Sequence, residues 1–181
     1  MKLSILICTL PDRKLMLTSL LVKLNRQIKG EVDIHIAHEP HLTIGEKRNL
    51  LLENSTGEYV CFIDDDDDVS DNYIDLLMEG INKGVDCSSL KGDYIVDGHF
   101  DSIFEHSVKY KEWKTTDNVI KYERYPNHLN CIKSSIAKQF KFPEKNFGED
   151  HDWSRQIHES GLIKTEHYID QVIYYYKKVT K

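Results

Sequence analysis

Short apolar runs alternate with helix-like segments three times before residue 85, and this alternation limits the folds open to the chain. Strands separated by helices in this way run parallel and are joined by right-handed crossovers. The first run, LSILICT, is rich in aliphatic residues, as expected of a strand covered on both faces. We therefore predict an α/β protein with a mostly parallel central sheet. Its strands are expected at 3–9, 32–37 and 58–63, and its helices at about 17–28, 43–52 and 70–81.

Two of these helices begin with capping signals. Thr43-Ile44-Gly45-Glu46 has the Thr-x-x-Glu pattern of a capping box, in which the side chains of the first and fourth residues satisfy free backbone N–H groups. Ser70 is a suitable N-cap for the third helix. These signals predict where the second and third helices start.

The second half of the chain has a different pattern. Aromatic and β-branched segments between residues 85 and 125 predict antiparallel strands and hairpins. Helices are predicted at 134–140 and 150–160, followed by one or two strands at 168–176, where the tyrosines 174–176 are interpreted as strand packing. A length of 181 residues, 40% of them apolar, suits one domain with a buried core. We therefore predict a single domain, residues 1–181, with an antiparallel second half.

The charge balance and the cysteines exclude several classes of protein. With 24 basic and 30 acidic residues the net charge is −6, which argues against a nucleic-acid partner. The apolar run at 3–10 is too short for a transmembrane helix, which needs about 20 residues, or for a signal peptide. Four widely spaced cysteines without a C-x-x-C pair are typical of reduced core residues. We expect a cytoplasmic protein without a transmembrane segment.

Five consecutive aspartates, Asp64 to Asp68, directly follow the third predicted strand. In open α/β sheets, ligands bind outside the carboxyl ends of the strands. Two carboxylates about 4 Å apart repel each other by about 4 kcal/mol at an effective dielectric constant of about 20. A shared Mg²⁺ or Mn²⁺ would relieve this repulsion and leave positions open for substrate phosphates. A solvated acidic loop is the alternative interpretation.

Four segments of the chain carry a family likeness. In chain order they are LSILICTLPDR, IGEKRNLLLENSTGEYVCFIDDDD, FPEKNFGEDHDWSRQI and VIYYYK. Together they resemble the GT-A-type nucleotide-sugar glycosyltransferases, specifically the inverting enzymes of family 2. The resemblance implies a single GT-A-like (Rossmann-like) domain, with about 1–84 as the nucleotide-binding half and about 85–181 as the acceptor and catalytic half. It also implies metal-dependent, inverting transfer of a sugar from a nucleotide-diphosphate sugar, with UDP as the expected carrier, to an acceptor hydroxyl.

The same resemblance implies roles for single residues on the donor side. Those expected to contact the nucleotide, its base or its diphosphate are Thr9, Arg13, His38, Glu39 and Arg48. Among the aspartates, the resemblance implies Asp64 for the ribose and Asp66 for the metal, with Asp65 and Asp67 as alternatives for either role.

The resemblance implies Asp150 as the catalytic base, with Glu149 beside it. Both lie at the start of a predicted helix, where the macrodipole favours the ionised carboxylate. Plain helix capping is the alternative explanation for these acids. Trp153 and His128 are candidates for contacts with the acceptor, and core packing is the alternative for Trp153.

Two other functions remain open at this point. A nucleotidyltransferase also places carboxylates on Mg²⁺, but its first strand is usually followed by a glycine-rich basic loop, and the segment LPDRK has no glycine. A non-catalytic module that binds a nucleotide or a cation is the second alternative.

Overall fold

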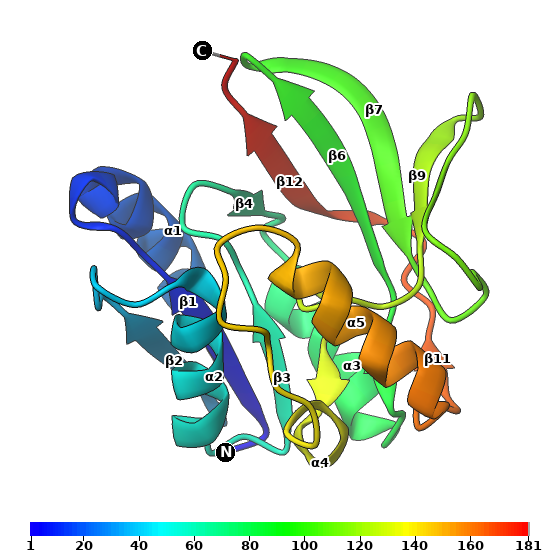
Figure 1. Cartoon of the computed structure of the whole chain (residues 1–181), viewed down its shortest axis with the longest axis horizontal. Helices are drawn as coiled ribbons and strands as arrows, with labels where there is room; N and C mark the ends of the chain where they lie inside the picture. Colours follow the sequence, from blue (N-terminus) through cyan, green and yellow to red (C-terminus); the bar gives the residue numbers. More distant parts are fainter. Residues whose placement is uncertain (181) are drawn as a thin grey trace.

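Two six-stranded sheets form the framework of the chain (Figure 1). The computed structural model describes residues 1–180, so Lys181, the last residue of the predicted domain, lies outside the described part. The first sheet contains, in spatial order, β11 (Glu166–His167), β5 (Cys87–Ser88), β10 (Ile132–Lys133), β3 (Tyr59–Phe62), β1 (Leu3–Cys8) and β2 (Val32–Ala37). The second sheet contains β4 (Asp68–Val69), β12 (Val172–Lys178), β6 (Leu90–Val96), β7 (His99–His106), β9 (Ile120–Arg124) and β8 (Lys114–Thr115).

The first sheet is mostly parallel, which confirms the prediction. β1 lies between β2 and β3 and runs parallel to both, and β11 runs parallel to β5. β10 is antiparallel to both of its neighbours, β3 and β5. The three predicted strands of the first half are therefore present, and they lie side by side in this sheet.

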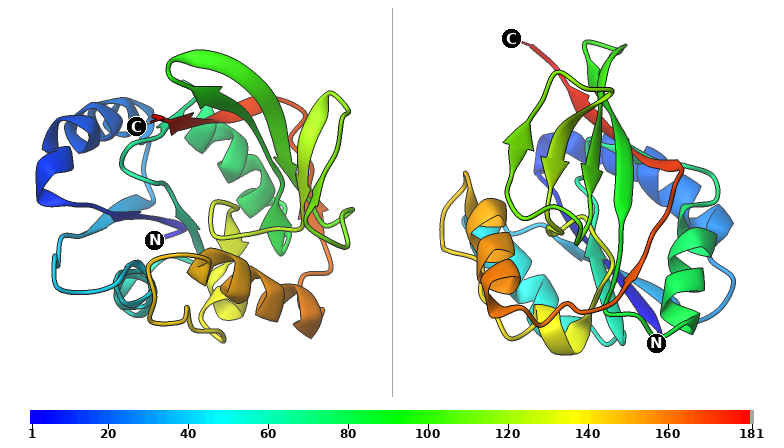
Figure 2. Two further views of the ribbon diagram at one scale, coloured as in Figure 1. Left: turned by 45° about the horizontal axis from the view of Figure 1, so that its top comes forward. Right: turned by 90° about the vertical axis from the view of Figure 1, so that its right-hand side faces the viewer.

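Helices cover both faces of the first sheet (Figure 2). Ile5 and Ile7 of β1 pack in the cluster that contains the side chains of α1 and α3, and Leu6 packs in the cluster that contains those of α2 and α5. Alternate residues of a strand point to opposite faces, so an all-aliphatic strand is buried on both sides, as predicted. The helices are α1 (Lys14–Gln27), which follows a 3-10 turn (Pro11–Arg13), α2 (Ile44–Asn54), α3 (Tyr73–Asn82), α4 (Ser134–Ala137) and α5 (Glu149–Ser160).

The start of α2 agrees with the sequence prediction and the start of α3 does not. Thr43 Oγ1 accepts a hydrogen bond from the Glu46 backbone N–H, and Glu46 Oε2 accepts one from the Thr43 N–H, which completes the capping box. The prediction that Ser70 caps α3 is wrong, because that helix begins at Tyr73. The N-cap position belongs to Asn72, and Ser70 continues the pairing of β4 with β12 instead, because its N–H donates to the carbonyl of Ile173.

The second sheet is mixed, so the prediction of an antiparallel second half is only partly right. β6 and β7 form an antiparallel hairpin, and β8 is antiparallel to β9. However, β12 runs parallel to β6, and β9 runs parallel to β7. Hairpins have local signals in the sequence, whereas these two parallel pairings join strands whose connection is long, and no local pattern specifies their direction.

The described part of the chain, residues 1–180, includes no helix with the length and hydrophobicity that crossing a membrane requires.

Candidate active site

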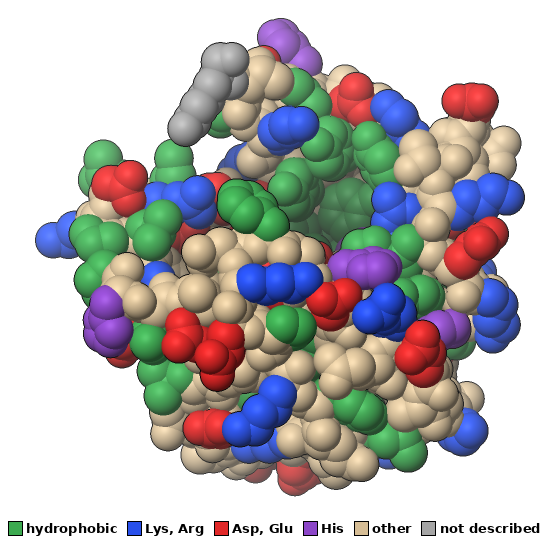
Figure 3. All heavy atoms as spheres, viewed as in Figure 1, with side chains coloured by type: hydrophobic (Ala, Val, Ile, Leu, Met, Phe, Trp, Pro, Cys, Tyr) green, Lys and Arg blue, Asp and Glu red, His purple; other side chains and the backbone are tan. Residues whose placement is uncertain are grey.

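A cavity of about 940 Å³ is enclosed by the carboxyl ends of β1 and β3, the second sheet and the start of α5. Figure 3 shows this face of the molecule, where a recess with hydrophobic side chains is bordered by charged ones. The structure brings most of the sequence-predicted site residues together here. Those that line the cavity are Thr9, Arg13, Arg48, Asp64, Asp65, Asp66, His128, Glu149 and Asp150.

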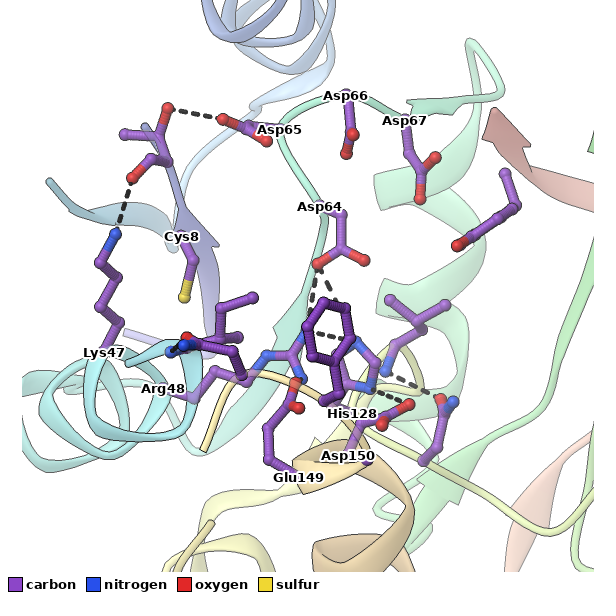
Figure 4. A pocket seen from close by; sticks show the side chains of 18 of the residues that line it. Cys8, Lys47, Arg48, Asp64, Asp65, Asp66, Asp67, His128, Glu149 and Asp150 are labelled. Atoms are coloured by element: carbon purple, nitrogen blue, oxygen red, sulfur yellow. Dashed lines mark hydrogen bonds and ion pairs between the residues drawn. The ribbon is translucent and has the colours of Figure 1, made fainter. Parts of the chain in front are cut away.

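Asp65 is held by the turn that follows β1. Its carboxylate accepts a hydrogen bond of 2.6 Å from the Thr9 hydroxyl and one of 2.8 Å from Arg13 Nη1, and its side chain is buried. In Figure 4, the side chain of Asp65 points toward the turn after β1, and the side chain of Asp66 points in a different direction. Both oxygens of Asp65 are thus occupied by the protein, and the residue joins the ends of two neighbouring strands.

Asp67 connects the acidic run to the last strand. Its Oδ2 accepts a hydrogen bond of 2.8 Å from the Tyr174 hydroxyl, and its Oδ1 accepts one of 2.8 Å from the Lys177 backbone N–H. Burial raises the pKa of Asp67 well above its usual value, and the charge of Asp64 adds to this effect. Both oxygens of Asp67 are therefore occupied by the protein as well.

Asp64 and Asp66 each keep one carboxylate oxygen without a hydrogen-bond or ion-pair partner in residues 1–180. The other oxygen of Asp64 is 3.2 Å from Arg48 Nη2, and that of Asp66 is 2.9 Å from Arg13 Nη1. Burial raises the pKa of Asp66; Arg13 opposes this rise, and the charge of Asp64 adds to it. The negative charge at Asp66 is thus only partly compensated.

This donor set suits a divalent cation that shares its coordination with a substrate. Within residues 1–180, no three side chains of His, Cys, Asp or Glu are gathered as a metal-ligand set. Mg²⁺ sites at substrate phosphates commonly use only one or two carboxylates, with the remaining ligands supplied by phosphate oxygens and water. Asp64 and Asp66 offer hard oxygen ligands of this kind at a place where negative charge is in excess.

Arg48 of α2 connects the two acidic motifs. Its Nη1 lies 2.5 Å from Glu149 Oε1, and its Nη2 lies 3.2 Å from Asp64 Oδ1 and 3.0 Å from His128 Nε2. Arg48 is buried although it is charged, which is sustainable because these partners surround it. Arg48 lies among the buried residues of α2, together with Leu51 and Leu52.

His128 lies between Arg48 and Asp150 (Figure 4). An arginine side chain can only donate hydrogen bonds, so His128 Nε2 must accept from Arg48 and the ring proton of the neutral imidazole is then on Nδ1. That Nδ1 is buried, has no hydrogen-bond partner in residues 1–180, and lies 3.9 Å from Asp150 Oδ2. His128 therefore presents an N–H group to the Asp150 carboxylate.

The two acids at the start of α5 have different surroundings. Gly148, just before the helix, has φ +72°, a left-handed conformation that favours glycine, and the helix begins at Glu149. The Glu149 side chain is buried against Arg48, whereas the Asp150 side chain is 29% exposed and lines the cavity. Asp150 is therefore the carboxylate that a substrate hydroxyl can reach.

Three predicted site residues lie outside the cavity. His38 and Glu39 follow β2, which is the edge strand of the sheet, and do not line the cavity; Pro40 and Leu42 of the same loop do. The prediction of Trp153 as an acceptor contact is wrong. Its ring is 1% exposed and stacks on Phe142 at a centroid distance of 4.6 Å, because its face of α5 packs on the sheet.

Several further residues line the cavity. Lys47 is buried and its Nζ donates a hydrogen bond of 3.0 Å to the Thr9 carbonyl, so it places positive charge beside the acidic run. The interpretation of the tyrosine run as strand packing describes Tyr174, which is fully buried. Tyr176, two positions further along β12 and therefore on the same face, lines the cavity. The other Phe, Tyr and Trp side chains that line the cavity are Tyr94, Phe104, Trp113, Tyr122 and Phe147.

Comparison with known sequences identifies a family. The family model described as "Glycosyl transferase family 2" matches residues 21–143, which is more than half of the chain. The succinoglycan biosynthesis protein ExoM of Rhizobium meliloti (strain 1021) is 45% identical over 47 residues, a stretch that covers 26% of this chain and 15% of that protein.

Solved structures show the same fold. The structure of S. aureus TarS 1-349 in complex with UDP-GlcNAc matches with a TM-score of 0.75 at 20% identity, covering 100% of this chain and 60% of that one. The complex of TarS 1-349 with UDP matches with a TM-score of 0.73 at 19% identity, covering 98% and 61%. The chain thus spans about 60% of the TarS structures and a much smaller part of ExoM. The likeness confirms the predicted GT-A-like fold.

Proposed function

The chain belongs to glycosyl transferase family 2, and on that premise we propose that it transfers a sugar from a UDP-linked donor to an acceptor hydroxyl with inversion at the sugar carbon. The observation that carries this proposal is that two acidic motifs, the run after β3 and the pair at the start of α5, line one cavity. A structure of similar fold binds UDP-GlcNAc, which supports UDP as the carrier.

In this proposal, residues 1–84 bind the donor and residues 85–181 bind the acceptor and supply the base. Asp64 binds the ribose, and Lys47 and Arg48 contribute positive charge toward the diphosphate. Thr9 and Arg13 position Asp65.

Asp66, assisted by Asp64, would hold Mg²⁺ or Mn²⁺. Such an ion, when bound, supplies positive charge that stabilises the leaving diphosphate. These two residues are the members of the run that keep a free carboxylate oxygen, which is why we assign the ion to them.

Asp150 acts as the base. It takes the proton of the acceptor hydroxyl while that oxygen forms a bond to the sugar carbon, and the bond from that carbon to the diphosphate oxygen breaks on the opposite side. Glu149 is committed to Arg48, so Asp150 is the free carboxylate of the pair. It lies in the first turn of α5, where the helix dipole favours negative charge.

Replacement of Asp150 by Asn tests the assignment. The amide cannot accept the proton, and removal of a general base costs about 100-fold to 10,000-fold in rate. We expect UDP release from UDP-glucose or UDP-GlcNAc to fall by at least about 100-fold, with the Kd for UDP changed by less than about threefold. Asp152→Asn is the matched control, because Asp152 lies on the same helix, pairs with Lys145 and does not line the cavity.

Unchanged turnover in Asp150→Asn would refute the role of Asp150. If the unmodified protein binds UDP in a metal-dependent way but releases none from a panel of UDP-sugars, the chain is a binding module. Release of pyrophosphate from UTP and a sugar phosphate would identify a nucleotidyltransferase instead.

A further inference from the structure

One wall of the cavity is built from aromatic side chains on the second sheet and the loop before β8. We call Tyr94, Trp113, Tyr122 and Tyr176 the aromatic wall; all four line the cavity. The register of the sheet sets three of them on one face, because Tyr176 pairs with Tyr94 across β12 and β6, and Tyr122 pairs with Phe104 across β9 and β7. None of these side chains has a role in the donor chemistry described above.

The three tyrosine rings of the aromatic wall form a row. The ring centroids of Tyr94 and Tyr176 are 5.2 Å apart with the planes nearly parallel, and those of Tyr94 and Tyr122 are 5.4 Å apart. Stacked atoms touch at about 3.5 Å, so a separation of 5.2 Å means that the two parallel rings are offset. Part of each ring face therefore stays uncovered, and Tyr176 is 36% exposed.

The row ends beside the proposed base. Arg124 Cζ lies 5.4 Å from the ring of Tyr122 and 5.3 Å from that of Trp113, so the guanidinium bridges the two rings. The Trp113 ring in turn meets His151 edge-on at 4.6 Å, and His151 follows Asp150 directly. The aromatic wall thus leads along the cavity to the carboxylate that the acceptor hydroxyl must reach.

Two groups at this end have unused hydrogen-bonding capacity. The Arg124 guanidinium has no carboxylate within ion-pair distance in residues 1–180, and its hydrogen bonds there, both from Nη1, go to backbone carbonyls. The Trp113 indole Nε1–H is buried and has no acceptor in the same residues. Unpaired donors are costly in a protein interior, and a ligand that brings oxygen acceptors offsets the cost.

We propose that the aromatic wall binds a sugar ring of the acceptor, so that the acceptor of this enzyme is a saccharide. A pyranose has a face of C–H groups that packs on aromatic rings and a rim of hydroxyl oxygens that accept hydrogen bonds from Arg124 and Trp113. A lipid chain would use the rings but leave both donors unpaired. The proposal rests on the proposed function, because it takes the donor to lie at the acidic run.

Saturation-transfer NMR tests the saccharide and the donor in one sample. The protein is mixed with UDP, Mg²⁺ and one disaccharide at a time (cellobiose, maltose or N,N′-diacetylchitobiose); Mg²⁺ is used because Mn²⁺ is paramagnetic. Irradiation of the protein is expected to saturate the ring C–H protons of at least one disaccharide as well as the uracil protons of UDP. Trp113→Ala and Tyr122→Ala are expected to lower the disaccharide signal at least fivefold relative to the UDP signal.

Two further variants separate stacking from folding. Tyr122→Phe keeps the ring and is expected to keep the disaccharide signal. Phe100→Ala removes an exposed ring from the same sheet, outside the cavity, and is expected to change neither signal. A melting curve of each variant shows that it is folded.

The outcomes distinguish the two proposals. UDP saturation without saturation of any disaccharide would overturn the saccharide assignment and leave the donor site standing. Disaccharide saturation that depends on Trp113 but occurs without any UDP signal would support the aromatic wall and count against the proposed function. Equal disaccharide signals in Trp113→Ala and the unmodified protein would place the sugar elsewhere and overturn the inference.

Discussion

Arg48 and Glu149 are 101 residues apart in the chain and form an ion pair whose Nη1–Oε1 distance is 2.5 Å. Their side chains are only 6% and 5% exposed. The same guanidinium also contacts Asp64 and His128, so one buried charge connects the end of β3 to the start of α5. This ion pair therefore fixes the two acidic motifs of the proposed active site relative to each other.

Removal of Glu149 should destabilise the protein. Loss of one partner from a buried ion pair leaves an uncompensated charge and costs about 3–5 kcal/mol. We expect Glu149→Ala to lower the free energy of unfolding by this amount in urea denaturation, and Glu149→Gln to lower it by less because the amide oxygen still accepts a hydrogen bond. The matched control is Glu53→Ala, which breaks the exposed pair with Lys141 and should change stability little. Equal stability of Glu149→Ala and the unmodified protein would contradict a structural role for the pair.

The effect of Mg²⁺ on donor binding should depend on Asp66. We expect Asp66→Asn to raise the Kd for UDP in the presence of Mg²⁺ at least tenfold, because one of two anionic ligands is lost. In EDTA, the variant and the unmodified protein should bind UDP equally. Calorimetry measures both conditions. Asp68→Asn is the control, since Asp68 belongs to the same run but pairs with Lys23 and does not line the cavity. If Asp66→Asn and the unmodified protein bind UDP with the same Kd in Mg²⁺, Asp66 is not the residue that binds the ion.

His128 should act as a positioning residue for Asp150. His128→Asn keeps an N–H group near the position of Nδ1, whereas His128→Gln reaches the position of Nε2 and loses the group that faces Asp150. We expect His128→Gln to lower kcat about tenfold, equivalent to about 1.4 kcal/mol, with the donor KM nearly unchanged, and His128→Asn to retain most activity. A purely structural role would lower the kcat of both variants alike.

His106 should make stability depend on pH. Burial lowers the pKa of His106 to about 3, and the charge of Arg124 contributes to this shift. The unfolded chain has a histidine pKa of about 6.5, so below that pH the unfolded state binds one more proton than the folded state. The free energy of unfolding should therefore fall by up to about 1.4 kcal/mol per pH unit between about pH 6 and pH 4 through this residue alone.

Urea denaturation across this pH range measures the effect. His106→Gln should lower the slope of the unfolding free energy against pH by up to about 1.4 kcal/mol per pH unit, which corresponds to one proton. His99 is an exposed histidine on the same strand, and His99→Gln should leave the slope unchanged. An unaltered slope in His106→Gln would mean that this side chain does not set the dependence.

The elements of the first half were predictable because their signals are local. The capping box of α2 involves residues 43–46, and the aliphatic run of β1 lies within six residues. The start of α3 and the direction of β12 were not predictable, because each depends on a contact with a distant strand. Trp153 was a candidate for an acceptor contact with core packing as the alternative, and the packing of α5 on the sheet places it in the core.

The sequence alone determined that strands and helices alternate, that acids follow the third strand and open a late helix, and that the chain belongs to glycosyl transferase family 2. Only the tertiary structure decided which of the consecutive aspartates are free. Asp65 is bound by Thr9 and Asp67 by Tyr174, partners that lie 56 and 107 positions away in the chain. Aspartates that are adjacent in the sequence differ in reactivity because each carboxylate depends on the groups that surround it in space. Those groups come from distant parts of the chain and are brought together only by folding.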